Sequence, residues 1–346
     1  MDKVEFFGKI GEQSVWKIRL HNQNLSCEIL TYGATVRSLI VPDRAGKPTD
    51  VVLGYDSLEE YIRGTSYFGA IIGPVANRIG GAAYPLGGKT WEMEKNDGEN
   101  SLHSGSAGLD RKVWDIMEYS DEAVTLSCVH PDGLGGIPGD IKVAVTYTLL
   151  NKALQIEYWA VSDRDTLCSL TNHCYFNLDG HGAEPITDHK IMLLAHSFTP
   201  TDACSIPTGS IRACAGTPMD LTHLTRIGDH IDDDYDQVRD AGGYDHNWLI
   251  DPSDQGMSFR PAALVKGAKS GISMTVRTDR PCVQFYTGNY IENGTRGKDG
   301  AVYNRRQALC LETQGFPDAP NHVSFLPITL AAGRLWRSRT EYSFSN

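Results

Sequence analysis

Apolar and polar side chains alternate without a break through one stretch of this chain, Ile141-Lys142-Val143-Ala144-Val145-Thr146-Tyr147-Thr148-Leu149. A period of two places every second side chain on the same face, which is the pattern of a half-buried β-strand. Residues 154–160 repeat the pattern after the short link Asn151-Lys152, whose two residues suit a tight turn. The two stretches therefore predict a β-hairpin.

Similar strand patterns recur along the whole chain. They lie at residues 26–40, 124–129, 272–276, 283–286 and 308–313. Glycine accounts for 35 of the 346 residues, above the average share of roughly 7 %, and clusters of Gly, Pro and Asp separate the strands. Only residues 57–63 and 221–231 are candidate helices. We expect an all-β protein, a large sandwich or barrel with few short helices, forming a single domain over residues 1–346.

Charge and composition exclude several classes of protein. The formal net charge of -11 argues against nucleic-acid or anionic-membrane partners, which attract clustered Lys and Arg. The N-terminus lacks the basic and apolar regions of a signal peptide, and no stretch approaches the ~20 apolar residues of a membrane span. The eight cysteines include no Cys-x-x-Cys pair, so we expect reduced, mostly buried thiols in a cytoplasmic protein. The acidic run at residues 232–236 lacks the glycine and distal glutamate of a calcium loop.

Common cofactor motifs are missing from the sequence. Gly88-Lys89-Thr90 resembles the end of a phosphate-binding loop, but Ala83 occupies its leading glycine position. No dinucleotide-binding fingerprint, nucleophile elbow or His-Glu-x-x-His motif occurs. Hydride transfer, phosphoryl transfer and serine hydrolysis therefore lack their usual signatures, and no metal site is expected.

Two segments far apart in the chain carry a candidate acid and base. In residues 171–177, read as a strand, alternation places His173 and Tyr175 on one polar face together with Thr171 and Asn177. In residues 308–314, Glu312 shares a face with small neighbours and stands within an apolar strand, where a charge is costly unless it is partnered or functional. The local sequence alone leaves both a structural and a catalytic interpretation open for each residue.

Other polar segments suit a ligand with many hydroxyl groups. They place an amide beside a cation at Asn77-Arg78, an imidazole near glycine at His103, a carboxylate at Asp245 and an amide at Gln284. Alternation puts Asp245 and His246 on opposite faces, so the two are not joint ligands of one metal. Amides, hydroxyls, a carboxylate, an arginine and aromatic rings together favour a sugar.

Taken in order, these segments resemble the galactose mutarotase (aldose 1-epimerase) family over nearly the whole chain. The matching motifs are Ala76-Asn77-Arg78, Leu102-His103, Thr171-Asn172-His173 with Asn177-Leu178, Tyr244-Asp245-His246-Asn247, Gln284-Phe285-Tyr286-Thr287-Gly288-Asn289 and Leu311-Glu312-Thr313-Gln314. The resemblance implies a large antiparallel β-sandwich with an open sugar cleft. It also implies cofactor-free interconversion of the α and β anomers of aldohexoses such as galactose and glucose.

The resemblance also implies roles for individual residues. Glu312 matches the general base and His173 the general acid, and we expect the first to start ionised and the second protonated. The residues expected to contact the sugar are His103, Arg78, Asn77, Asp245, Gln284 and Tyr175. The chain departs from the family pattern at Ser104, Leu109 and Pro74-Val75, positions that we expect to bear on the preferred sugar.

A hexose-phosphate epimerase is one alternative, but it should need more than one basic residue near the cleft, and only Arg78 can be placed there. Two further alternative functions remain open. One is a sugar-binding module without catalysis, in which Glu312 only accepts hydrogen bonds. The other is a glycoside hydrolase that uses Asp245 and Glu312 as its pair of carboxylates. In every case the expected partner is a small aldose, and the chain is expected to be a monomer or a homodimer.

Overall fold

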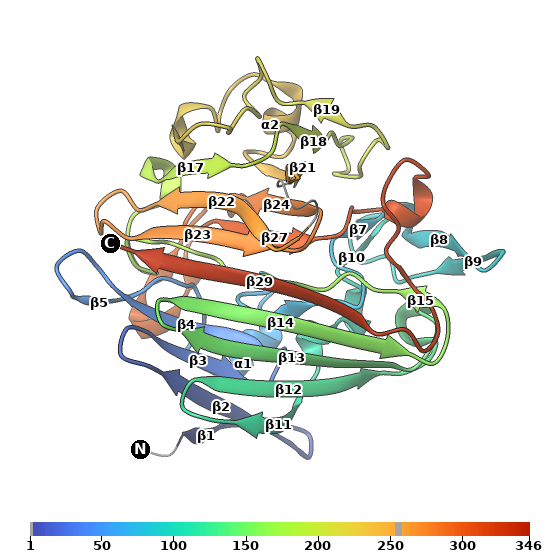
Figure 1. Cartoon of the computed structure of the whole chain (residues 1–346), viewed down its shortest axis with the longest axis horizontal. Helices are drawn as coiled ribbons and strands as arrows, with labels where there is room; N and C mark the ends of the chain where they lie inside the picture. Colours follow the sequence, from blue (N-terminus) through green and yellow to red (C-terminus); the bar gives the residue numbers. More distant parts are fainter. Residues whose placement is uncertain (1–2, 253–257) are drawn as a thin grey trace.

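The computed structural model describes residues 3–252 and 258–346. Its largest sheet has nine strands in the order β11-β12-β13-β14-β29-β23-β22-β17-β20, and its long strands cross the middle of Figure 1. Their bounds are β11 Asp115–Tyr119, β12 Ala123–His130, β13 Ile141–Leu150, β14 Ala153–Ser162, β29 Trp336–Ser345, β23 Ser273–Thr278, β22 Arg260–Lys266, β17 Lys190–Leu193 and β20 Thr225–Arg226.

Two five-stranded sheets accompany it. The N-terminal one consists of β1 Val4–Ile10, β2 Gln13–His21, β3 Ser26–Leu30, β4 Thr35–Pro42 and β5 Pro48–Asp50. The other follows the order β19 Arg212–Ala213, β18 Ser197–Thr199, β21 Asp245–Leu249, β24 Cys282–Tyr286 and β27 Cys310–Gln314. Within the described residues, every pairing between strands of these three sheets is antiparallel.

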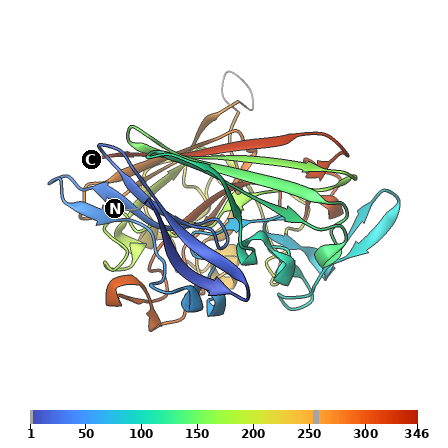
Figure 2. The ribbon, with the colours of Figure 1, turned by 90° about the horizontal axis from the view of Figure 1, so that it is seen from below.

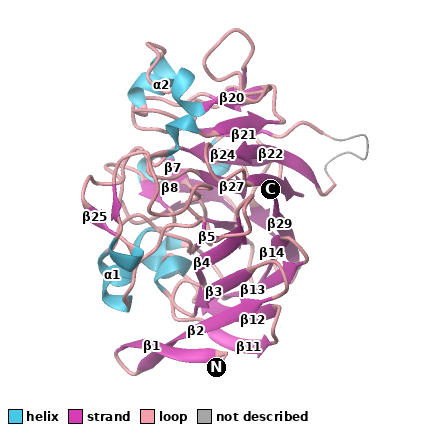
Figure 3. Ribbon diagram, turned by 90° about the vertical axis from the view of Figure 1, so that its left-hand side faces the viewer, coloured by secondary structure: helices cyan, strands magenta, loops and turns pink. Residues whose placement is uncertain are grey.

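Short two-stranded pairs and small helices fill the connections. The pairs are β7 Arg78–Ile79 with β10 Ser101–Leu102, β6 Ile71–Ile72 with β16 Thr171–Asn172, β8 Ala83–Leu86 with β9 Lys89–Glu92, β15 Thr166–Leu167 with β28 Thr329–Leu330, and β25 Thr295–Arg296 with β26 Val302–Tyr303. The two α-helices are α1 Leu58–Arg63 and α2 Asp236–Asp240, and Figure 3 shows them outside the sheets. Short 3-10 turns cover Gly80–Ala82, Gly105–Ala107, Leu109–Arg111, Leu134–Gly136, Ile186–Asp188, Ile227–Asp229, Lys298–Gly300 and Ala319–Asn321.

A single large cluster of buried apolar side chains joins the three sheets. It includes Ile156 from the nine-stranded sheet, Ile29 from the N-terminal sheet and Phe285 from the third. Tyrosines on the nine-stranded sheet also reach across: the Tyr147 hydroxyl donates to the Ala34 carbonyl at 2.5 Å, and the Tyr342 hydroxyl to a carbonyl of β27 at 3.2 Å. The nine-stranded sheet thus forms one layer of a β-sandwich, and its long strands β12–β14 and β29 lie along the top of Figure 2.

The predicted hairpin is confirmed. β13 and β14 pair along their whole length, from Ile141 opposite Ser162 to Leu150 opposite Ala153, which leaves Asn151-Lys152 as a two-residue turn. Burial alternates along β13 as the sequence pattern predicts. The predicted strands at 124–129, 272–276, 283–286 and 308–313 correspond to β12, β23, β24 and β27.

Residues 26–40 form two strands where the sequence predicts one. β3 and β4 are separated by a tight turn in which Gly33 and Ala34 adopt left-handed φ values of 65° and 47°. The predicted helix at 57–63 is confirmed as α1, whose first turn is closed by a reciprocal capping box between Ser57 and Glu60. The predicted helix at 221–231 is wrong, because β20 pairs there with β17.

Residues 171–177 are also not the continuous strand that the alternation predicts. Regular pairing stops after Asn172, because its side chain takes over backbone hydrogen bonds: Nδ2 donates to the Gly69 carbonyl, and Oδ1 accepts from the Cys174 N–H. A side chain that bonds the local backbone competes with a strand ladder. The chain then turns so that His173 and Tyr175 still reach a common cleft, whereas Asn177 points elsewhere and donates to the Glu184 and Gln307 carbonyls.

Seven of the eight cysteines are buried, as expected, and Cys204 is exposed. Among the described residues, none of the helices is both long enough and apolar enough to span a membrane.

Candidate active site

A cleft of about 440 Å³ lies over the sheet formed by β21, β24 and β27. Seven of the eight side chains that the sequence predicts for the site line it together: Asn77, Arg78, His103, His173, Tyr175, Asp245 and Glu312. They come from segments spread over more than two hundred residues. The structure therefore brings into one cleft the acid, the base and most of the polar groups proposed from the motifs.

Strand register sets the positions of the groups on the sheet. Gln284 of β24 lies opposite Glu312 of β27 on one side and Asn247 of β21 on the other. Asp245 and Tyr286 form the next row on the same face, since side chains two residues apart on a strand point the same way. The alternation predicted for each strand is confirmed by this register.

Gln284 does not line the cleft. Its Nε2 donates to Asp245 Oδ1 at 2.8 Å, while its Oε1 accepts from Gln314 Nε2 at 3.3 Å. Arg78 borders the same carboxylate, with Nη1 3.9 Å from Asp245 Oδ2 and Nε donating to Asp97 at 2.7 Å. Gln284 thus orients the Asp245 carboxylate, which faces the cleft.

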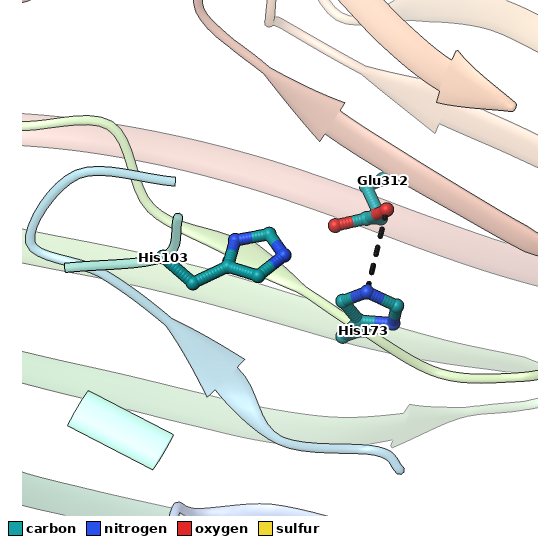
Figure 4. Close-up of side chains that lie close together, drawn as sticks. All are labelled: His103, His173 and Glu312. Atoms are coloured by element: carbon teal, nitrogen blue, oxygen red, sulfur yellow. Dashed lines mark ion pairs between the residues drawn. The ribbon is translucent and has the colours of Figure 1, made fainter. Parts of the chain in front are cut away.

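His173 and Glu312 are close enough to act on one ligand. His173 Nε2 lies 3.7 Å from Glu312 Oε1, and Figure 4 shows the imidazole and the carboxylate next to each other, with His103 alongside. Both side chains are almost fully buried. Glu312 Oε2 is buried and has no hydrogen-bond partner among the described residues. A buried carboxylate oxygen without a partner is costly, and a hydroxyl or other donor of a ligand in the cleft can satisfy it.

Burial works against the starting protonation states expected from the sequence. It raises the pKa of Glu312 well above its usual value, and nearby Asp245 raises it further, while Arg78 lowers it. Burial also lowers the pKa of His173 to about 4. Both groups are therefore favoured in their neutral forms. A neutral acid with a neutral imidazole holds the same single proton as a carboxylate with an imidazolium, so the two states differ only in where that proton resides.

His103 is held in one tautomer by the backbone. The Asn77 N–H donates to His103 Nδ1 at 3.0 Å, so Nδ1 carries no proton and the neutral ring carries it on Nε2. Burial lowers the pKa of His103 well below its usual value, with smaller contributions in the same direction from His173 and Arg78. His103 is thus a neutral hydrogen-bond donor.

The same hydrogen bond bears on metal binding. His103, His173 and Glu312 have ligand atoms that all lie within 4.8 Å of one another. A histidine that coordinates a metal through one nitrogen normally donates from the other to an acceptor. Because His103 Nδ1 accepts from a backbone N–H, its Nε2 retains a proton and does not suit a metal ion.

Several residues of the cleft hold strained backbone conformations. Tyr67, Asn77, His103 and Ser205 all have φ values between 56° and 65°, in the left-handed region that side chains other than glycine seldom occupy. Such conformations gather at functional sites because the surrounding structure has to impose them. The cleft wall is therefore fixed by its loops as well as by the sheet.

Sequence reasoning missed part of the cleft wall. Tyr67, Asp97, Cys204 and Tyr290 also line it, and none of them stands in one of the motifs singled out. For Tyr67 the local sequence gives no such signal, because its place in the wall depends on its left-handed backbone conformation, with φ 57°.

The positions that depart from the family pattern lie behind the cleft. Pro74, Val75, Ser104 and Leu109 do not line it. The Ser104 hydroxyl accepts from the Val75 N–H at 3.0 Å, and the Leu109 N–H donates to the Gly73 carbonyl at 2.9 Å. Ser104 and Val75 thus contact each other, next to the loops that carry Asn77 and His103.

Comparison with known proteins agrees with the resemblance. The family model described as aldose 1-epimerase matches residues 17–343. The chain belongs to the aldose 1-epimerase family. The family is one of isomerases, so the chain is an enzyme of that class.

Individual members of the family cover almost the whole chain. A galactose mutarotase from Bos taurus is 40 % identical over 336 residues, covering 97 % of this chain and 96 % of that protein. An aldose 1-epimerase from Escherichia coli (strain K12) is 33 % identical and covers 94 % of this chain and 93 % of that protein. The crystal structure of an aldose epimerase homologue from C. elegans has a TM-score of 0.88 at 30 % identity and covers 95 % of this chain and 98 % of that one.

Proposed function

We propose that this protein interconverts the α and β anomers of aldohexoses such as galactose and glucose by acid/base ring opening, with Glu312 as the base and His173 as the acid. The observation that carries the proposal is the 3.7 Å approach of His173 Nε2 to Glu312 Oε1. This pair lies in a cleft whose other polar groups suit a sugar.

The reaction needs one proton removed and one delivered. Glu312 takes the proton of the C1 hydroxyl, whose oxygen electrons form the C1 carbonyl. The C1–O5 bond breaks, and its electron pair takes a proton from His173 at O5. The C1–C2 bond then rotates, and the same two groups reverse their roles as the ring closes on the other face.

Three further groups support the reaction from fixed positions. The neutral His103 donates from Nε2 and stabilises negative charge that develops on a sugar oxygen, and Arg78 adds a positive charge to the same wall. Asp245, oriented by Gln284, accepts from ring hydroxyls. Positioning of this kind contributes to the rate because the reacting atoms are already aligned.

The test is polarimetry with freshly dissolved α-D-galactose or α-D-glucose. Glu312→Gln removes the base and leaves a side chain of the same shape, so we expect kcat to fall about 10²–10⁴-fold while calorimetry still detects sugar binding. The matched control Glu122→Gln, at an exposed position, should behave as the wild type does. Activity of Glu312→Gln close to that of the wild type would refute the role of the base. An aryl galactoside assayed in parallel measures hydrolysis.

We also propose that the chain works in the cytoplasm as one domain, without a cofactor, as a monomer or homodimer. The large apolar cluster shared by the three sheets supports a single domain, and the composition of the chain supports the location.

A further inference from the structure

His173 is stacked with two tyrosine rings. The centroid of its imidazole is 5.0 Å from that of Tyr175, at an interplanar angle of 18°, and 5.7 Å from that of Tyr67, at 25°. Both rings are close to parallel with the imidazole. The sequence around His173 does not reveal the contact with Tyr67, because Tyr67 comes from a different loop.

Backbone hydrogen bonds hold the segments that carry the three rings. His173 and the segment after Tyr67 are joined by two hydrogen bonds, from the His173 N–H to the Ala70 carbonyl at 2.9 Å and from the Gly69 N–H to the His173 carbonyl at 3.0 Å. Tyr67 has φ 57°, which side chains rarely adopt. Tyr175 is fixed by its carbonyl, which accepts from the Leu53 N–H at 2.9 Å.

The face of an aromatic ring is negative and attracts a cation within about 6 Å of its centroid. Two such ring faces, both stacked with His173, stabilise an imidazolium more than a neutral imidazole. The attraction is larger away from water, and His173 is buried. The stacking therefore acts against the effect of burial, which favours the neutral ring.

We propose that Tyr67 and Tyr175 are positioning residues that stack with His173 and shift the single proton of the His173–Glu312 pair toward the imidazole. This inference rests on the acid role proposed for His173. It explains how the protonated form of a buried histidine becomes populated enough to deliver a proton to O5.

The other ionisable groups around His173 do not replace this effect. Those that face it are Glu312 and Cys310 from β27, His103 from the loop after β10 and Tyr286 from β24. Glu312 is the proton's alternative site, and His103 is neutral. Cys310 Sγ lies 3.5 Å from His173 Nδ1, and burial raises the pKa of its thiol. None of these neighbours supplies a second fixed negative charge.

The experiment measures the pKa of His173 by NMR of histidine-labelled protein, together with kcat as a function of pH. Tyr67→Phe keeps the ring and should keep the pKa. Tyr67→Leu removes the ring, and we expect the pKa of His173 to fall by about one unit. An acid loses its activity as the pH rises through its pKa, so this fall moves the loss to lower pH and reduces kcat about tenfold above both values.

A fluorinated series separates the charge of the ring from its shape and remains informative if Tyr67→Leu does not fold. Di- and trifluorinated phenylalanine at position 67 weaken the negative face at nearly constant volume, so the pKa should fall stepwise relative to Tyr67→Phe. The control series consists of Tyr119→Phe and Tyr119→Leu, which change an exposed ring of β11. It should leave the pKa of His173 unchanged.

A pKa that stays constant across the fluorinated series overturns the inference. Its failure is separable from failure of the proposed function. If the pKa follows fluorination while His173→Asn retains full polarimetric activity, the effect of stacking stands and the acid role is wrong.

Discussion

At the scale of single residues, burial shifts the pKa values of His173 and Glu312 in opposite directions, and both shifts favour the neutral forms. His173 and Glu312 are predictable because each stands in a polar motif with an ordered set of companions. Their burial is set by segments from the whole chain, and it is burial that raises the pKa of Glu312 and lowers that of His173. Tyr67 was missed because its place depends on a left-handed turn that no local pattern requires.

His103 provides a prediction about tautomers. We expect its imidazole to be neutral, with the proton on Nε2, at the pH of about 6.5 where a free imidazole is half protonated, because burial lowers its pKa and Nδ1 accepts from the Asn77 N–H. Long-range ¹H–¹⁵N NMR distinguishes the two tautomers and the cation by their nitrogen shifts. The same protein unfolded in urea supplies the reference spectrum. A doubly protonated His103 at about pH 6.5 would contradict this prediction and would require the Asn77 N–H to move away.

At the scale of elements, alternation predicts a strand only where nothing else competes for the backbone. The β13–β14 hairpin has apolar residues at every second position and a two-residue turn, so local sequence and fold agree. Residues 171–177 alternate as well, but the Asn172 side chain takes the hydrogen bonds that a neighbouring strand would make. The predicted helix at 221–231 was wrong because pairing of β20 with β17 prevailed over a weak local preference.

The turn that carries Tyr67 gives a prediction at this scale. Gly69 has φ 72°, and a Cβ there would lie 2.1 Å from the Val36 carbonyl oxygen. That carbonyl belongs to β4, so it cannot move aside without distorting a sheet. We expect Gly69→Ala to lower the free energy of unfolding by more than about 3 kcal/mol and to reduce kcat, because the turn and His173 share backbone hydrogen bonds.

The matched control is Gly81→Ala. Gly81 has φ 61°, but an added Cβ would meet nothing within 4 Å, so only the conformational cost of about 1–2 kcal/mol applies. Urea unfolding and polarimetry measure both variants. Equal losses in the two proteins would mean that the contact with β4 contributes nothing.

At the scale of the whole molecule, three sheets share one apolar core. The cleft lies on the five-stranded sheet that contains β21, β24 and β27. The all-β class and the β13–β14 hairpin follow from local patterns, whereas the large antiparallel sandwich was implied by the family resemblance. The order β14-β29-β23 does not follow from local patterns, because β29 is the last strand of the chain and inserts between strands far from it in sequence. Such pairings depend on the burial of complete faces, which no short window contains.

Burial on this scale also gives a dependence of stability on pH. His130 of β12 is fully buried, and burial lowers its pKa to about 4, with nearby Lys112 acting in the same direction. The unfolded chain binds a proton at this residue below about pH 6.5, whereas the folded chain does not until about pH 4. The contribution of His130 is therefore complete above pH 6.5 and is lost progressively as the pH falls from 6.5 to 4.

We therefore predict that His130→Leu makes the protein less sensitive to acid. Between pH 7 and pH 5, the stability of the variant should improve by about 2 kcal/mol relative to the wild type, because one fewer proton is taken up on unfolding. Urea unfolding followed by circular dichroism at each pH measures this, and a single transition would also support one domain. Leu126→Ala, a buried change in the same strand, should reduce stability equally at both pH values. If His130→Leu shows the same pH dependence as the wild type, the folded protein binds that proton and the imidazole is not kept neutral by the core.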